Sequence, residues 1–175
     1  IVVQGDGHGK VRLEFGRATH TLQSGAAFTG TGTVSVPFPG TLALATNVSA
    51  VHLNLNGGTI DGAGVLTVAG SLEWTDGTMT GPGATGIAPG GSLHIGGSSL
   101  KILERRVTNA GNATWDGTGD ILSGQGAVFT NQAGASLIIA SDQTWFFNLG
   151  GSQTQFDNQA GSTLTKIGGG GATTF

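Results

Sequence analysis

The chain of 175 residues is long enough to bury a hydrophobic core, yet 34 residues are glycine and only 10% are charged. Four prolines and glycines without a three-residue period exclude collagen, and 37% hydrophobic residues argue against disorder. A net charge of −3 without a basic stripe argues against nucleic-acid binding. No apolar run reaches the roughly 20 residues that span a bilayer, and the absence of cysteine excludes disulfides.

Short segments of alternating apolar and polar residues follow one another along the chain. Examples are Val11–Phe15, Val51–Asn56, Leu72–Trp74 and Leu93–Ile95. This period of two predicts β-strands, and no window carries a helical pattern. The sequence is therefore expected to be all-β.

A glycine closely followed by an apolar residue recurs at Gly70, Gly91, Gly111, Gly134 and Gly161, at intervals of 21, 20, 23 and 27 residues. Short strands at this spacing predict a parallel β-solenoid of about seven to eight rungs, in which each coil buries its apolar residues against its neighbours. A β-sandwich is the alternative, but its turns recur every 8–12 residues. We expect residues 1–175 to form one solenoid domain, a segment of a longer protein, with an N-terminal edge-strand region at 1–20.

Two late segments, "FTNQAGASL" from Phe129 and "FDNQAGSTL" from Phe156, are interpreted as two copies of one corner. Phe129 and Phe156 are expected to stack inside the coil. The asparagines of these copies and of the shorter "VTNAGNATW" are expected to form a ladder of Asn109, Asn131 and Asn158.

The units "GSLEWTDGTMTGPG" and "VTNAGNATWDGTGDILSGQG" resemble repeats of bacterial surface proteins of the autotransporter and filamentous-haemagglutinin type. The resemblance implies a single-stranded right-handed parallel β-helix, of the pectin-lyase-like superfold, at the cell surface or outside the cell. "GGTIDGAG" at Gly57–Gly64 is similar to a turn of pectin-degrading β-helix enzymes.

The residues needed for polysaccharide cleavage are not found. Glycoside hydrolysis requires two carboxylates flanking the bond, and the chain has no Asp-Asp pair. His8, in "GHG", lies too early in the chain for the order seen in those enzymes, and Asp61 is expected to serve a turn. We therefore predict no catalytic residues, no metal site and no cofactor.

Glu73 and His94 fall on adjacent rungs when Leu72–Trp74 is aligned with Leu93–Ile95, and Asp116 lies one outward position along the next unit. Neighbouring strands are about 4.8 Å apart, so Glu73 and His94 are expected to touch. Two interpretations remain open: an exposed cross-strand pair, or part of a metal or acid–base site.

Three further features bear on ligand binding. The run "KILERR" at Lys101–Arg106 is interpreted as a corner, a chain interface or a contact for sulfate or acidic sugars. Trp74 and Trp115 are expected to stack in the core, whereas Trp145, in the longest interval, is the candidate ligand platform on a bulging corner. Threonines at Thr29–Thr33 and Thr78–Thr80 share no fixed phase, which argues against an ice-binding face.

The expected function is structural, as an extracellular solenoid of a fibre, adhesin or surface stalk. Because no cap is visible at either end of the pattern, we expect self-association through the solenoid ends. A carbohydrate-binding or polysaccharide-cleaving β-helix, with a polysaccharide or cell-surface glycan as partner, is the alternative.

Overall fold

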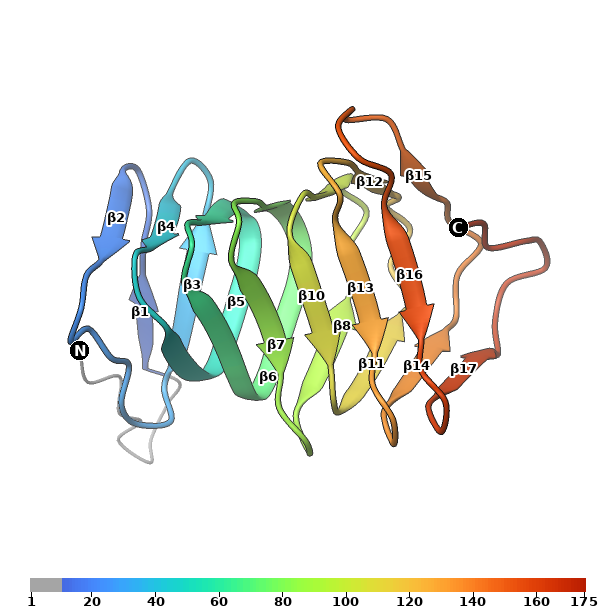
Figure 1. Cartoon of the computed structure of the whole chain (residues 1–175), viewed down its shortest axis with the longest axis horizontal. Coiled ribbons are helices and arrows are strands. Elements are labelled where there is room, and N and C mark those ends of the chain that lie inside the picture. The colour runs from blue at the N-terminus through green and yellow to red at the C-terminus, as the bar shows by residue number, and fades with distance from the viewer. Residues whose placement is uncertain (1–10) are drawn as a thin grey trace.

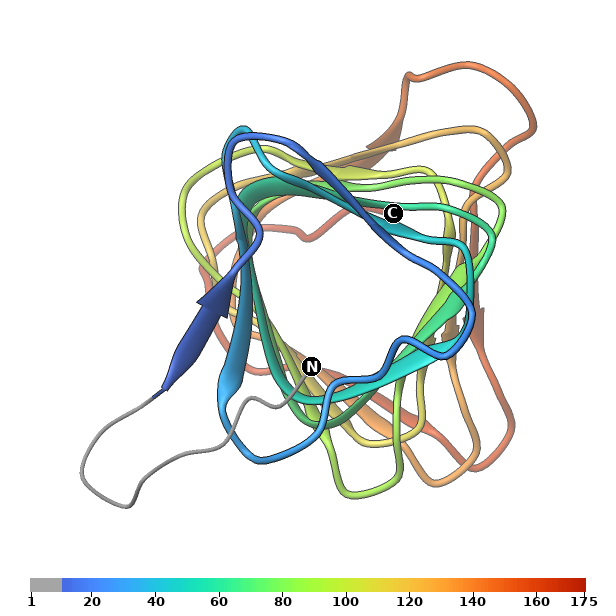
Figure 2. The same ribbon diagram turned by 90° about the vertical axis from the view of Figure 1, so that its left-hand side faces the viewer.

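A computed structural model describes residues 11–175, and every regular element in this range is a β-strand. The 17 strands form one continuous parallel sheet that coils around a single axis (Figures 1 and 2). Viewed from the N-terminal end in Figure 2, the chain runs clockwise as it recedes, so the coil is right-handed. The predicted parallel β-solenoid is confirmed. The described range contains no helix long and apolar enough to cross a membrane.

Each coil contributes strands to three faces. Face 1 stacks eight strand segments: β1 (Arg12–Glu14), β3 (Thr33–Pro37), the middle of β5 (Val48–Asp61), the middle of β6 (Val65–Met79), β8 (Ser92–Ile95), β11 (Asn112–Trp115), β14 (Ser136–Ile139) and β17 (Thr163–Lys166).

Face 2 stacks β2 (Thr19–Leu22), β4 (Thr41–Leu44), the ends of β5 and β6, β9 (Lys101–Leu103), β12 (Ile121–Ser123) and β15 (Trp145–Phe147). Face 3 stacks the starts of β5 and β6, β7 (Ala84–Ile87), β10 (Arg106–Asn109), β13 (Val128–Asn131) and β16 (Gln155–Asn158). The solenoid has about six turns rather than seven to eight, because face 3 has six segments and the first and last coils are incomplete.

The core consists of columns of apolar side chains, one residue from each coil. The longest column lies on face 1 and reads Leu13, Val34, Leu53, Leu72, Leu93, Ala113, Leu137 and Leu164. Most of its members are fully buried, because alternation along each strand points every second side chain inward. Burial of these columns is the main favourable contribution to folding.

Glycines occupy corners where no larger residue fits. A Cβ at Gly111 would collide with the carbonyl oxygen of Gly91 in the coil below. Gly134 and Gly161 follow the two F-x-N-Q-A segments and have φ angles of 83° and 84°, a left-handed conformation that favours glycine. The high glycine content thus reflects tight corners between closely stacked strands.

Candidate functional site

The two copies of the F-x-N-Q-A-G corner stack in register on face 3. Phe129 pairs with Phe156, and their rings are stacked with centroids 5.7 Å apart and planes at 12°. The segments that follow also align, with Leu137 opposite Leu164. The repeated motif therefore places equivalent side chains one above the other.

The three asparagines that were predicted to form a ladder lie in one inward column. Asn109 donates from Nδ2 to Oδ1 of Asn131 at 2.9 Å, and Asn131 donates to Oδ1 of Asn158 at 2.8 Å. Asn109 and Asn131 are fully buried and Asn158 is exposed. Each buried amide also donates to a main-chain carbonyl on the neighbouring face, Ser136 and Thr163 respectively. The ladder therefore fastens the corner between faces 3 and 1.

Trp74 and Trp115 are both buried in a second column of face 1. Ile95 lies between them and Ile139 follows, so the two indoles alternate with isoleucines and do not stack directly. Alternation of large aromatic and branched side chains fills the interior at this position.

The C-terminal coil leaves inward positions uncovered. Leu164, the last residue of the longest core column, is 41% exposed. All four residues of β17 are exposed, and within the described range β17 pairs with no strand other than β14. Among the described residues the Nδ2 group of Asn158 has no acceptor. This end consequently presents an unpaired strand edge beside the exposed end of the Leu164 column and an open ladder.

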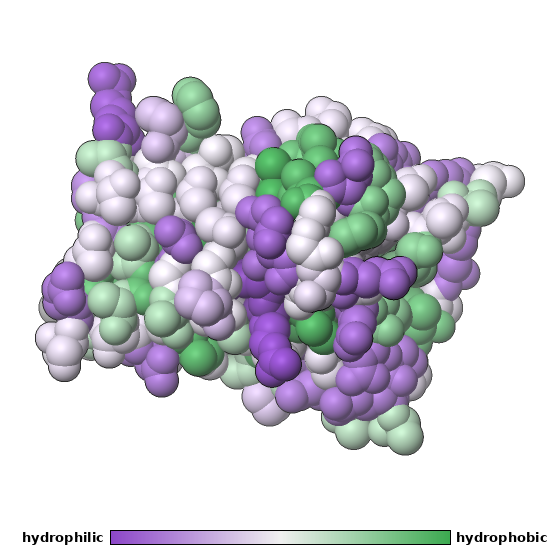
Figure 3. Space-filling model, turned by 45° about the horizontal axis from the view of Figure 1, so that its top comes forward, coloured by the Kyte–Doolittle hydropathy of each residue, from purple (hydrophilic) through white to green (hydrophobic). Residues whose placement is uncertain are grey.

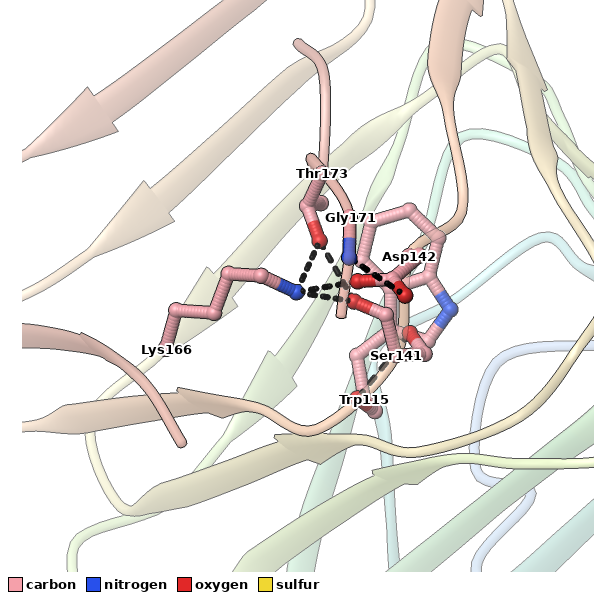
Figure 4. Close-up of polar contacts among 6 residues, drawn as sticks. All are labelled: Trp115, Ser141, Asp142, Lys166, Gly171 and Thr173. Carbon is pink, nitrogen blue, oxygen red and sulfur yellow. Dashed lines mark hydrogen bonds and ion pairs between the residues drawn. The ribbon is translucent and has the colours of Figure 1, made fainter. Parts of the chain in front are cut away.

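The chain after β17 is held by a polar cluster (Figure 4). Lys166 Nζ lies 2.7 Å from both Asp142 Oδ1 and the carbonyl oxygen of Ser141, and Gly171 donates its amide to Asp142 Oδ2 at 3.0 Å. The hydrogen bonds from Lys166 and Gly171 lower the pKa of the Asp142 carboxyl group. A parallel bridge between Thr144 and Thr174 then starts a further coil on face 2.

Trp145 differs from the exposed platform that its long interval suggested. Its side chain is only 6% exposed, and Nε1 donates to Oγ of Ser123 at 2.8 Å. The bulge occurs after β15, at residues 148–154, so the tryptophan remains in the regular strand. Its ring nevertheless lines a cavity of about 390 Å³ that opens at the C-terminal end of face 2.

Glu73 and His94 face each other on the outer side of face 1, together with Asp116. His94 Nδ1 lies 2.6 Å from Glu73 Oε2, and Nε2 lies 2.7 Å from Asp116 Oδ1. Burial lowers the pKa of His94, but the hydrogen bonds to both carboxylates outweigh it, so the pKa is raised above 6.5. When the ring is protonated, it donates to both carboxylates and joins three coils.

This arrangement favours an electrostatic clamp. Both ring nitrogens of His94 are occupied by carboxylates, and all three side chains are more than a third exposed. Within residues 11–175 no group of three or more histidine, cysteine or carboxylate side chains is arranged to hold a metal ion. His8, the other histidine considered for chemistry, lies outside the described residues.

The run Lys101–Arg106 is not an exposed basic patch. Lys101 and Arg105 are buried, because alternation along β9 and into β10 turns both inward. Burial lowers the pKa of Arg105 to about 10. Its Nη2 group donates to the carbonyl oxygens of Gly64 and Ala84, so the guanidinium links the corner before β6 to the start of β7.

An outward row on face 2 carries threonines that the sequence pattern did not reveal. Through strand pairing the row reads Thr19, Thr41, Thr59, Thr78, Ile102, Leu122 and Phe146. Figure 3, which brings the upper side of Figure 1 forward, shows apolar side chains gathered over the C-terminal half of this face. The next outward row reads Thr21, Ala43 and Asp61, so the threonines form one row and no two-row lattice.

No family model, no curated protein and no solved structure matches the chain.

Proposed function

We propose that this chain is a structural β-solenoid that associates end to end, with its C-terminal coil as the docking surface for the first coil of a second copy. The observation that carries the proposal is the unpaired edge of β17 beside the exposed Leu164. An uncovered strand edge provides free main-chain donors and acceptors for another strand. The open core column beside it provides the apolar contact.

The incoming coil would repeat contacts that already exist within the chain. A strand paired with β17 would cover Leu164 as β17 covers Leu137, and an acceptor placed above Asn158 would continue the amide ladder. The resulting filament fits the fibre or stalk of extracellular surface proteins whose repeats the sequence resembles. We assign the chain no catalytic activity.

Sedimentation equilibrium over a range of protein concentrations tests the proposal. We expect the wild-type chain to associate reversibly and Leu164→Lys, which places a charge in the open core column, to remain monomeric. Leu100→Lys is the matched control, because Leu100 is 46% exposed but lies in the middle of the stack. A monomeric wild-type chain at the highest concentrations, or loss of association in Leu100→Lys alone, would refute end-to-end docking.

A further inference from the structure

The cavity beside Trp145 arises from a change in the length of one corner. Residues 124–127 connect β12 to β13, whereas residues 148–154 connect β15 to β16 in the next coil. The longer connection bends away from the stack (Figure 2), and the space of about 390 Å³ lies between it, β15 and the residues near the C-terminus. This volume falls in the usual range of ligand pockets, about 300–1,000 Å³.

Half of the lining is aromatic. The rings come from β15, β16 and the last residue of the chain: Trp145, Phe146, Phe147, Phe156 and Phe175. Phe156 and Phe175 are 4.6 Å apart between centroids, and both contact Trp145. Phe147 and Phe175 remain 45% and 49% exposed, so ring surface is available at the mouth of the cavity.

The other half of the lining is polar and uncharged, from Ser123, Thr144, Gln153, Thr154 and Thr174. Two of these residues have unused hydrogen-bonding capacity. Thr154 Oγ1 is enclosed and has no partner, and the exposed amide of Gln153 makes no hydrogen bond within the described chain. An enclosed hydroxyl group without a partner is destabilising and is satisfied when a ligand supplies a donor or acceptor.

We propose that this cavity binds a neutral carbohydrate of one or two rings. The negative faces of aromatic rings attract the polarised C–H groups of a sugar, while hydroxyl and amide side chains exchange hydrogen bonds with its hydroxyls. No charged residue among residues 11–175 lines the cavity, so an acidic sugar would lose its hydration without gaining a counterion. The cavity lies in the same C-terminal coil that end-to-end docking uses, but its lining includes no residue of β17.

Titration with neutral saccharides tests the site, with glucose, galactose, maltose and cellobiose as the panel and galacturonic acid as the charged comparison. The indole N–H signal of Trp145, assigned with Trp145→Phe, reports on the cavity in two-dimensional NMR spectra. We expect one or more neutral saccharides to shift this signal saturably, without shifting that of Trp74 on face 1. No shift with any neutral saccharide, or tighter binding of galacturonic acid, would overturn the proposal.

Two variants test the contacts. Phe147→Ala removes a ring at the mouth and is expected to weaken binding at least about tenfold, and Gln153→Ala removes an exposed amide without removing core packing. Phe38→Ala, at a 78% exposed phenylalanine outside the cavity, is the control and is expected to leave binding unchanged. Equal affinity in all three variants would refute the site. A Trp145 signal that shifts with protein concentration alone would instead show that a second copy fills the cavity.

Discussion

Replacing Asn131 with alanine removes the central member of the asparagine ladder. Asn131 is fully buried and makes three side-chain hydrogen bonds. Its Oδ1 accepts from Asn109 at 2.9 Å, and its Nδ2 donates to Asn158 at 2.8 Å and to the Thr163 carbonyl at 2.9 Å. The substitution therefore breaks contacts with the coil on either side.

The expected loss follows from these bonds. A net contribution of about 1 kcal/mol for each gives about 3 kcal/mol for Asn131→Ala. Asn158→Ala makes the same chemical change at the exposed end of the ladder, where one bond is lost next to solvent, and is expected to cost less than about 1 kcal/mol. The pair of variants separates the effect of burial from that of the amide itself.

Urea unfolding followed by tryptophan fluorescence measures both variants against the wild-type chain. The free energy of unfolding must fall with urea concentration at the same slope in all three proteins, so that a difference between midpoints is a difference in stability. A loss for Asn131→Ala no larger than that for Asn158→Ala would refute the stabilising role of the ladder.

Two further predictions concern the clamp and the corners. Because the pKa of His94 is raised in the folded chain, the clamp contributes its full stabilisation below about pH 6.5 and loses it as the pH rises through the pKa of His94 in the folded chain. Glu73→Gln should lower this pKa in an NMR titration. An unchanged pKa would disprove the clamp. Gly111→Ala should lower the free energy of unfolding by more than about 1 kcal/mol, because the new Cβ would meet the carbonyl oxygen of Gly91. Gly170→Ala places its Cβ in open space and should leave the stability unchanged. Similar urea midpoints for the two variants would contradict the close approach of the coils.

The sequence predicted which residues align on adjacent coils wherever the same motif recurs. Phe129 and Phe156, like Asn131 and Asn158, occupy the same place in two copies of one motif, so any coil that repeats with the motif aligns them. The contact of Glu73 with His94 followed from the same argument, because equivalent positions on adjacent rungs are about one strand spacing apart.

Other features depend on where extra residues enter a coil. Thr41, Thr59 and Thr78 stand 18 and 19 residues apart, and later coils are longer, so a fixed period does not reveal their row. The length of the interval around Trp145 indicated a bulge but not that it follows the tryptophan. The charges of Lys101 and Arg105 suggest that both side chains lie on the surface. Both are buried instead, because alternation along the strand decides which side chains turn inward.

Disulfide trapping tests end-to-end docking most directly, since the chain has no cysteine. Arg12 and Thr163 occupy the first and last described positions of one outward row on face 1. Continued register would place them on adjacent strands of two copies, at a spacing of about 4.8 Å that suits a disulfide. A mixture of Arg12→Cys and Thr163→Cys chains is predicted to form mixed dimers on oxidation, in excess over either homodimer. Cross-links only between identical variants, or none at concentrations where the chain associates, would contradict the proposed stacking.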